Sequence, residues 1–418
     1  MAGSKALRPG RGRRIIFVNR FFYPDESATA QILTDLAAHL ASRPAETGAG
    51  EEVHIITSRL SYADPSVRHA AEETWSGVTI HRVATTGFGR GKLVGRAVDY
   101  LSFYASSFFK GLGLARRGDV VVAKTDPPLL GVTMGLAGRL KGARRVNWLQ
   151  DVFPEVAAAS DIRVPLAGVL KALRNRSLVK ADLNVAIGSR MRDLVVAETG
   201  GRADAAIIHN YVDDALVPDP EGAAELRAEW GYGRDDFIIG YSGNLGRAHD
   251  IETVLAAAER LKTDPSIHFL FVGGGHLRAD VEARASALSL TNVATRAYVP
   301  RALLAQSLSL PDVHWVTLIP AMEGLIVPSK LYGIAAAGRP ALVVGDPAGE
   351  LAQMVEAHRF GLNIVPGDGA GFAAAVQALK ADRARIDAMG QAARRFAETE
   401  GARRRAFALW EAVLDRLA

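Results

Sequence analysis

The chain has 418 residues, of which 49% are hydrophobic and 23% charged, a composition that predicts two to three globular domains of about 150 residues each and excludes a disordered or collagen-like chain. It contains no cysteine, which excludes a disulfide framework, a thiolate zinc site, a cysteine nucleophile and an iron–sulfur cluster. Residues 1–212 hold 29 basic and 19 acidic residues (net +10), and residues 213–418 hold 21 and 26 (net −5), which suggests that the first half faces an anionic partner.

The chain opens with basic residues, and its first apolar run, Ile15 to Val18, is shorter than the about 7 residues of a signal peptide, so no export signal is predicted. The longest weakly polar stretch, 97–115, contains Asp99 and Lys110 and falls short of the about 20 apolar residues of a membrane-spanning helix. We therefore expect a cytoplasmic protein without a membrane span, in a compartment whose reducing conditions suit a chain without cysteine.

Short β-branched runs alternate with helical segments throughout, which is typical of parallel sheets wrapped by helices. Strands are predicted at 14–19, 52–58, 78–83, 119–125, 145–150, 182–187 and 206–210, and again at 237–242, 268–272, 292–298, 313–319, 340–344 and 362–365. Ser27 or Thr29 can cap the helix after the first strand. The strand, loop, helix order begins again after Tyr241. The prediction is an α/β fold of two Rossmann-like, doubly wound domains that face each other across a cleft.

Composition also predicts the domain boundaries. The segment 210–222 has the proline-rich and acidic composition of a linker, so the first domain is expected at 1–212 and the second at 213–395. The last segment, 396–418, is expected to be a helix with one apolar stripe formed by Phe407, Trp410, Leu414 and Leu417. Such a stripe must pack on another part of the chain.

Ligands of open α/β sheets bind at the carboxyl ends of the strands, so the chemistry is expected in strand-to-helix loops. The first such loop is NRFFYPDESAT, 19–29. Either Glu26, Ser27 and Thr29 only cap the next helix, or Arg20 and Tyr23 line the cleft floor where an acceptor binds. The second loop is WLQDVFPE, 148–155, in which Asp151 is either a helix cap or a group aimed at a sugar hydroxyl or a developing positive charge.

The third loop, YSGNLGRAHD at 241–250, has two glycines that let its backbone approach a ligand. The free N–H groups of the following helix, with Asn244, Arg247 and His249, predict a diphosphate cradle, although neither the Walker nor the GxGxxG pattern is present. In the fourth loop, AMEGLIVPSKLYGIAAAGRP at 321–340, Glu323, a glycine turn, a helix start and Lys330 lie within eight positions. That combination can bind sugar hydroxyls and phosphate together.

This fourth segment, with YSGNLGRAHDIETVL, NVATRAYVPRALLAQSL and RIIFVNRFFYPDESATAQ, resembles the retaining glycosyltransferase family 4, in the branch that builds bacterial surface polysaccharides. The similarity covers nearly the whole chain. It implies the GT-B fold, with a nucleotide sugar bound mainly by the second domain and an acceptor by the first. It also implies that the last helix crosses back onto the first domain.

The resemblance assigns roles to individual residues. Glu323 matches the first glutamate of the family's paired-glutamate motif, which contacts the transferred sugar. The second glutamate, a ribose ligand, would fall at Gly333 and is missing, which leaves Lys330, Tyr332 or a backbone group as substitutes. The common Arg and Lys of the phosphate loop align with Asn244 and His249, so Arg247 is the expected cation. The histidine that the family carries near the end of a first-domain strand falls close to Asp151 and is absent as His.

We therefore predict three groups of site residues. The catalytic residues are Glu323 and Asp151. The nucleotide-sugar ligands are Gly243, Asn244, Arg247, Tyr298, Gly324, Leu325 and Lys330, with Tyr298 in the segment that holds the base. The acceptor-side residues are Arg20, Tyr23 and Glu26.

The implied mechanism keeps the anomeric configuration and uses no protein nucleophile, because the departing UDP takes the acceptor proton on the same face of the sugar. The protein then chiefly stabilises the leaving diphosphate and orients the sugar. No DxD-like pair occurs on a suitable loop, so we expect no metal and no cofactor.

The expected reaction is transfer of a hexose or N-acetylhexosamine from a nucleotide diphosphate sugar, UDP-linked, to a polyprenyl-diphosphate-linked or other glycan acceptor in cell-surface polysaccharide synthesis. Two alternatives stay open: a nucleotide-sugar epimerase of GT-B fold, and a non-catalytic GT-B interaction subunit, which the missing glutamate at Gly333 favours. Nucleic-acid binding is not expected, because no recognition motif is present.

The basic first domain also predicts peripheral docking on the anionic inner face of the cell membrane. In the segment 92–117, apolar side chains (Leu93, Leu101, Phe103, Tyr104, Phe108 and Phe109) accompany Arg96, Lys110, Arg116 and Arg117. Either these apolar side chains face the membrane, or they face the core.

Overall fold

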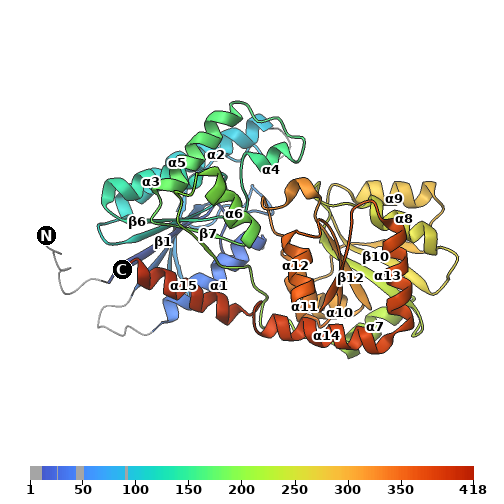
Figure 1. Cartoon of the computed structure of the whole chain (residues 1–418). Helices are drawn as coiled ribbons and strands as arrows, with labels where there is room; N and C mark the ends of the chain where they lie inside the picture. The colour runs from blue at the N-terminus through green and yellow to red at the C-terminus, as the bar shows by residue number, and fades with distance from the viewer. Residues whose placement is uncertain (1–11, 26, 44–50, 90–92) are drawn as a thin grey trace.

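The computed structural model describes residues 12–25, 27–43, 51–89 and 93–418. Two α/β domains lie side by side, each with one sheet at its centre (Figure 1). All predicted strands are present, with bounds that differ from the predicted ones by no more than three residues. Two Rossmann-like domains with parallel sheets are therefore confirmed.

The first sheet has eight strands in the order β3-β4-β2-β1-β5-β6-β7-β8, and all neighbours are parallel except β3 and β4. The strands are β1 Arg14–Val18, β2 Glu52–Ser58, β3 Glu72–Trp75, β4 Val78–Val83, β5 Val120–Lys124, β6 Arg144–Trp148, β7 Leu183–Ala186 and β8 Ala205–Ile207. The sequence did not predict β3, because this short edge strand (EETW) is largely exposed and has no apolar run.

Helices cover both faces of this sheet. They are α1 Ala28–Ser42, α2 Leu93–Leu114, α3 Leu130–Lys141, α4 Glu155–Ala158, α5 Ala167–Lys180 and α6 Ser189–Glu198. Successive β1 side chains point to opposite faces: Ile15 and Phe17 pack with α1, whereas Ile16 and Val18 pack with α2 and α3. The Ser27 Oγ accepts a hydrogen bond from the backbone N–H of Ala30, so Ser27 is the helix cap of α1.

The second sheet has six parallel strands in the order β11-β10-β9-β12-β13-β14. They are β9 Phe237–Asn244, β10 Ile267–Gly274, β11 Val293–Arg296, β12 Val313–Thr317, β13 Ala341–Val344 and β14 Gly361–Ile364. Its helices are α7 Pro220–Glu229, α8 Glu252–Leu261, α9 Arg278–Ala287, α10 Leu304–Ser309, α11 Lys330–Ala336, α12 Glu350–Ala357, α13 Gly369–Ala381 and α14 Arg383–Glu398. One apolar cluster joins α8 and α13 to this sheet.

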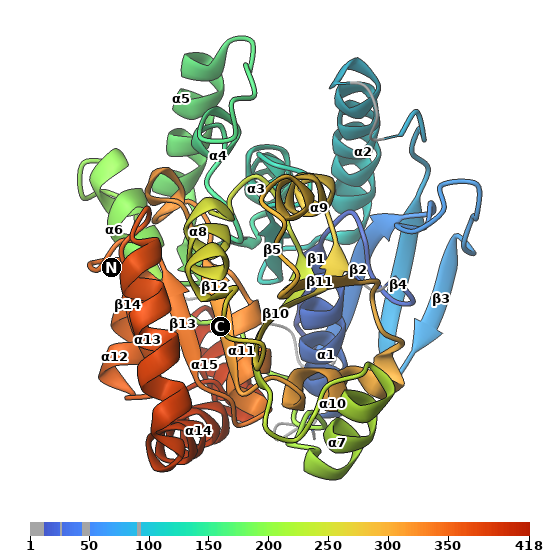
Figure 2. The same cartoon turned by 90° about the vertical axis from the view of Figure 1, so that its right-hand side faces the viewer.

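The helix α2 carries the apolar side chains for which the sequence left two orientations open. Phe103 is fully buried against the sheet, whereas Leu101 and Phe109 are 64% and 70% exposed. One face of α2 thus packs on the core, and the opposite face is exposed to solvent. The helix α3 lies between α2 and α5 (Figure 2). No helix among the described residues is long and apolar enough to cross a membrane.

The chain returns to the first domain at its end (Figure 1). The helix α14 ends on the second domain at Glu398, and α15 Arg403–Arg416 packs on the first, so the predicted terminal segment holds the end of one helix and all of the next. The ring of Trp410 is fully buried, with its centroid 4.6 Å from that of Trp148 and 6.3 Å from that of Phe17. The C-terminal helix thereby completes the core of the first domain.

Replacing Trp410 by alanine should lower the free energy of unfolding by about 3–5 kcal/mol, because it opens a cavity between two buried aromatic rings. Urea unfolding followed by circular dichroism measures this loss. The matched control is Leu409→Ala on the exposed side of α15, for which we expect less than about 1 kcal/mol. Equal losses in the two variants would mean that α15 does not complete the core.

Candidate functional site

The loops that follow β6 and β12 meet between the domains. Asp151 forms an isolated antiparallel bridge with Ile326, and the Val152 N–H donates to the Leu325 carbonyl at 2.9 Å. Around this contact, one apolar cluster combines side chains of both domains, including Val152 and Met191 of the first and Leu325 and Leu331 of the second. The predicted residues Asp151, Gly324 and Leu325, far apart in sequence, are thus brought together.

Glu323 lies beside this contact in the loop between β12 and α11, and its side chain reaches the start of α12. Its Oε2 accepts a hydrogen bond from the backbone N–H of Glu350 at 3.2 Å. A Cβ added at Gly349 would overlap Glu323 Oε1, so the close approach of this carboxylate to the helix start requires glycine there. Burial raises the pKa of Glu323; the Glu350 hydrogen bond opposes that rise and the charge of Asp346 adds to it. Glu323 thus presents a half-buried carboxylate at the cleft.

A second attachment between the domains was not predicted from the sequence. The Glu350 Oε2 accepts hydrogen bonds from Ser189 Oγ at 2.7 Å and from the Arg190 N–H at 3.0 Å. The helix α6 has no side-chain cap of its own, because its N-cap residue is Gly188. Glu350 thus caps a helix of the opposite domain, and the Arg190 guanidinium donates to the Ala348 carbonyl. Gly349, which lies in the loop between the carboxyl end of β13 and the start of α12, was the sequence signal that could have pointed to this attachment.

The predicted diphosphate loop follows β9. Lys330 Nζ donates to His249 Nε2 at 3.0 Å, and a Cβ at Gly243 would lie 2.7 Å from Lys330 Cε. Burial lowers the pKa of Lys330 to about 8, and burial followed by the charge of Lys330 lowers the pKa of His249 to about 3. The imidazole is therefore a neutral acceptor, and the lysine lies against a bare glycine backbone. This half-buried amine has no carboxylate partner among the described residues.

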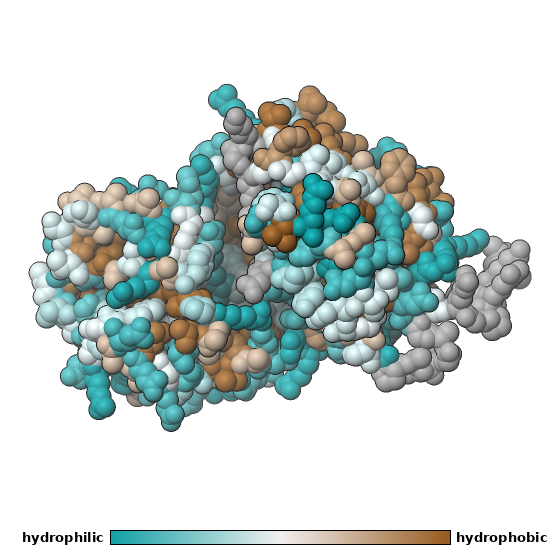
Figure 3. Space-filling view, turned by 180° about the vertical axis from the view of Figure 1, so that it is seen from behind, coloured by the Kyte–Doolittle hydropathy of each residue, from teal (hydrophilic) through white to brown (hydrophobic). Residues whose placement is uncertain are grey.

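Asn244 and Arg247 are exposed at the mouth of the same loop. Arg247 and His249 line a cavity of about 690 Å³ that also touches Asp161 of the first domain. Figure 3 shows the hollow between the two domains from behind. Tyr298 is 59% exposed, and its ring lies against Gly274, at the carboxyl end of β10. The predicted nucleotide-sugar residues are therefore gathered at one edge of the second sheet.

Gly333 does not belong to this edge. A Cβ there would contact Leu308 at 3.5 Å and Leu216 at 3.8 Å, so a side chain at position 333 points among apolar groups. Of the proposed substitutes for the missing glutamate, Tyr332 is buried against Phe396, and only Lys330 reaches the loop after β9.

On the first domain, Arg20 lines a cavity of about 280 Å³ together with Asp99, Tyr100 and Asp126. An Nη2–Oδ2 distance of 3.5 Å joins Arg20 to Asp99, while Arg20 Nε is buried with no partner among the described residues. Tyr23 does not line this cavity; its ring stacks on Trp75 at a centroid distance of 4.4 Å. The third acceptor-side residue, Glu26, lies outside the described residues.

Asp151 is not a helix cap, because α4 begins after Pro154 and no capping bond joins it to Asp151. Its Oδ1 is buried with no hydrogen-bond partner among the described residues. Burial, followed by the charge of Asp126, raises the pKa of Asp151 to about 7. Lys124, which was not predicted as a site residue, lines a small cavity together with Asp151. Burial lowers the pKa of Lys124 to about 7. No group of three or more His, Asp or Glu among the described residues could hold a metal ion.

Comparisons with known proteins point to one family. Residues 223–396 match the family model described as glycosyl transferases group 1. The chain is 32% identical over 267 residues to a probable glycosyltransferase, WbjE, of Pseudomonas aeruginosa, covering 61% of this chain and 64% of that one. It is 28% identical over 326 residues to a putative colanic acid biosynthesis glycosyl transferase, WcaI, of Escherichia coli K12, covering 73% of this chain and 78% of that one. The chain thus spans less than two thirds of the length of WbjE.

Solved structures share the fold. Sucrose-phosphate synthase from Thermosynechococcus elongatus superimposes with a TM-score of 0.75 at 16% identity, over 97% of this chain and 99% of that one. Anabaena Alr3699/HepE in complex with UDP-glucose gives a TM-score of 0.71 at 16% identity, over 96% and 99%. The GT-B fold predicted from the sequence is confirmed, and the second domain contains a glycosyltransferase group 1 segment.

Asp151→Asn should stabilise the protein at pH 8 by roughly 1–3 kcal/mol, because the buried carboxylate, whose Oδ1 has no hydrogen-bond partner among the described residues, no longer has to ionise. The folded pKa of about 7 lies above the unfolded value of about 4, so the wild type loses stability as the pH rises between them. The difference in the free energy of unfolding between Asp151→Asn and the wild type should therefore become smaller toward pH 5. Urea unfolding at both pH values measures it, with the exposed Asp161→Asn as control. A gap that does not depend on pH would contradict the raised pKa.

Proposed function

We propose that this chain is a retaining glycosyltransferase of family 4 that acts in cell-surface polysaccharide synthesis. The observation that carries the proposal is the contact of the Glu323 loop, within the group 1 segment, with the first-domain loop at Asp151. This contact brings a carboxylate, a glycine turn and a lysine to the cleft between two Rossmann-like domains, where ligands of such folds bind.

The proposed donor is a UDP-linked hexose or N-acetylhexosamine. A protein of the same fold, Alr3699/HepE, was solved with UDP-glucose, which supports this donor class. The diphosphate would lie on the loop after β9, in reach of Lys330, Arg247 and the first N–H groups of α8. Binding an anion beside Lys330 favours its charged form, which places a cation where the charge of the leaving group develops. Tyr298 would flank the base.

The chemistry then needs no protein nucleophile. The bond between the sugar C1 and the diphosphate oxygen breaks, and the acceptor oxygen bonds to C1 on the same face. The acceptor proton passes to the departing diphosphate. Glu323 would accept hydrogen bonds from the sugar hydroxyls and hold the ring in position, and its link to the start of α12 keeps the carboxylate oriented. The donor set at the cleft is made of oxygen and nitrogen side chains and backbone amides, and we propose that the reaction is independent of metal and cofactor.

The proposed acceptor is a glycan linked to a polyprenyl diphosphate, bound by the first domain at the Arg20 cavity. The similarity to WcaI supports the link to polysaccharide synthesis, and the net charge of +10 on residues 1–212 suits an anionic lipid carrier. Such an acceptor lies in a membrane, so we propose peripheral docking on the cytoplasmic face. Exposed apolar side chains on α2, such as Leu101 and Phe109, support this placement.

Transfer itself tests the proposal. The chain would be incubated with a panel of nucleotide sugars, with and without a polyprenyl-diphosphate-linked glycan, and the products analysed by mass spectrometry and by proton NMR of the anomeric position. We expect transfer that requires the acceptor and keeps the donor configuration. Conversion of the donor alone to an epimer would support the epimerase alternative. Absence of both reactions, with binding of nucleotide intact, would support the non-catalytic alternative.

Replacing Glu323 by glutamine should lower turnover by roughly 10²-fold or more, on the scale of losing one contact that strengthens in the transition state. Binding of UDP should persist, because the diphosphate lies on the loop after β9. Steady-state transfer kinetics and calorimetry measure the two effects. Glu356→Gln, an exposed glutamate on the adjacent helix α12, is the control that should leave both unchanged. Near-normal turnover in Glu323→Gln would contradict the proposal that Glu323 positions the transferred sugar.

Arg247→Ala and Lys330→Ala should each weaken UDP binding by about 1–3 kcal/mol, since each removes a charge-assisted hydrogen bond to phosphate. Isothermal titration calorimetry with UDP and with uridine separates the phosphate contribution from that of the base. The matched control is Arg260→Ala, an exposed arginine on α8. If both variants bind UDP as the wild type does, the phosphates occupy another place.

A further inference from the structure

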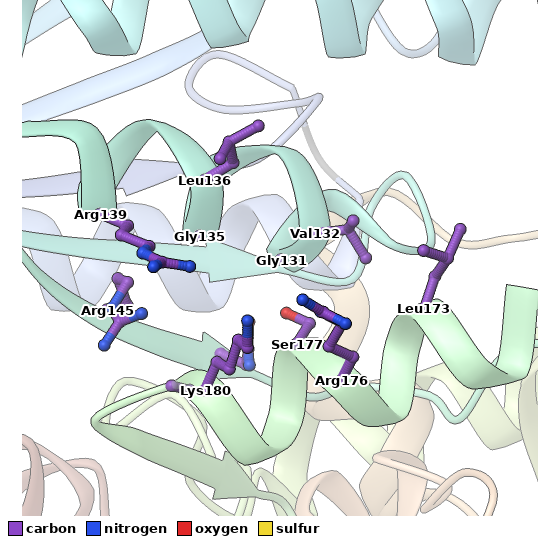
Figure 4. Close-up of a pocket in the computed structure, with 12 residues that line it drawn as sticks. Gly131, Val132, Gly135, Leu136, Arg139, Arg145, Leu173, Arg176, Ser177 and Lys180 are labelled. Carbon is purple, nitrogen blue, oxygen red and sulfur yellow. The ribbon is translucent and has the colours of Figure 1, made fainter.

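A groove of about 240 Å³ runs between α3 and α5 on the first domain (Figure 4), and two of its lining residues, Gly131 and Val132, also line the small cavity of Asp151 and Lys124. Both walls carry apolar side chains, with Val132 and Leu136 from α3 and Leu173 from α5. Gly135 leaves the groove open, because a Cβ there would meet only Ser177 Oγ, at 3.9 Å. None of these residues takes part in the proposed transfer reaction.

Four cationic side chains line the same groove: Arg139, Arg145, Arg176 and Lys180. Only Arg145 has a carboxylate partner among the described residues, Asp182, with an Nε–Oδ2 distance of 3.1 Å. Figure 4 shows Arg139, Arg176 and Lys180 reaching into the space between the helices. The charge of Arg176 is the main cause that lowers the pKa of Lys180. Three like charges without a partner repel one another, and a bound anion would remove that cost.

Exposed aliphatic side chains surround these cations. They are Leu136 and Leu140 on α3 and Leu166, Val169 and Leu173 on α5, all at least 42% exposed. The described residues that line the groove include aliphatic groups and no aromatic ring on which a nucleic-acid base could stack. Cations next to exposed aliphatic groups match an anionic headgroup that carries a hydrocarbon chain.

We propose that the α3–α5 groove binds the phosphate headgroup of an acidic phospholipid, with the acyl chain along Leu136 and Leu173. Occupation of the groove would hold the first domain on an anionic membrane. The inference deepens the proposed function, because it names the lipid partner of the membrane docking. It concerns a site separate from the nucleotide-sugar residues, so the two fail independently.

Sedimentation with phosphatidylglycerol vesicles and with phosphatidylcholine vesicles tests the proposal on the full chain. We expect binding to the first only. Arg139→Gln/Arg176→Gln/Lys180→Gln should weaken it by roughly fivefold for each charge removed. The control variant Arg234→Gln/Arg260→Gln/Lys262→Gln changes net charge equally, at exposed positions of the second domain, and should bind as the wild type does.

Gly135→Leu separates a seated headgroup from diffuse attraction, because it fills the groove and keeps every charge. We expect this variant to lose at least fivefold in vesicle binding while calorimetry shows UDP binding unchanged, which also shows that the chain is folded. Vesicle binding unaffected by Gly135→Leu, or equal losses in the two triple variants, would overturn the groove site. Preferential binding of single-stranded oligonucleotides over vesicles, lost in the first triple variant, would overturn the lipid assignment. None of these results bears on the binding of UDP to the second domain, which calorimetry measures separately.

Discussion

The candidate site depends on one contact, the backbone pairing of the loop after β6 with the loop after β12. The Val152–Leu325 hydrogen bond and an apolar cluster with side chains of both domains join the two loops. Glu350 adds a second attachment by capping α6 of the opposite domain. Capping a helix start stabilises the fold by about 1 kcal/mol, so this carboxylate favours the arrangement of the two domains in which it reaches α6. The backbone N–H of the same residue, Glu350, donates to Glu323, so the helix start that attaches the domains also orients this carboxylate.

Several buried ionisable groups lie at or near this cleft. Burial shifts the pKa of Glu323 and Asp151 upward and that of Lys330 and Lys124 downward, in each case toward the neutral form. Folded proteins retain such costly groups chiefly where a ligand or a reaction uses them. The lysine beside Gly243 has a neutral histidine in place of a carboxylate, and an anionic ligand is what would complete its surroundings.

The loops predicted from the strand pattern are the loops found at the cleft, because parallel strands place their carboxyl ends at one edge of a sheet. Within those loops the outcome differs by residue. Arg20 lines a first-domain cavity, whereas Tyr23, three positions later, stacks on Trp75 of the unpredicted edge strand β3. Lys124 and Arg190 gave no signal in the sequence. Their importance arises from burial and from a partner in the other domain, which no local spacing encodes.

The sequence by itself determined the strands, the two-domain fold and the glycosyltransferase resemblance, because hydrophobic periodicity and turn residues act locally along the chain. It also determined that Trp410 must be buried, since a helix with one apolar stripe needs a partner. The tertiary structure alone decided which residues meet: Asp151 with Ile326, Glu350 with Ser189, and Lys330 with His249. These contacts join positions tens to more than a hundred residues apart, and their energies come from burial and geometry that exist only once the domains have packed.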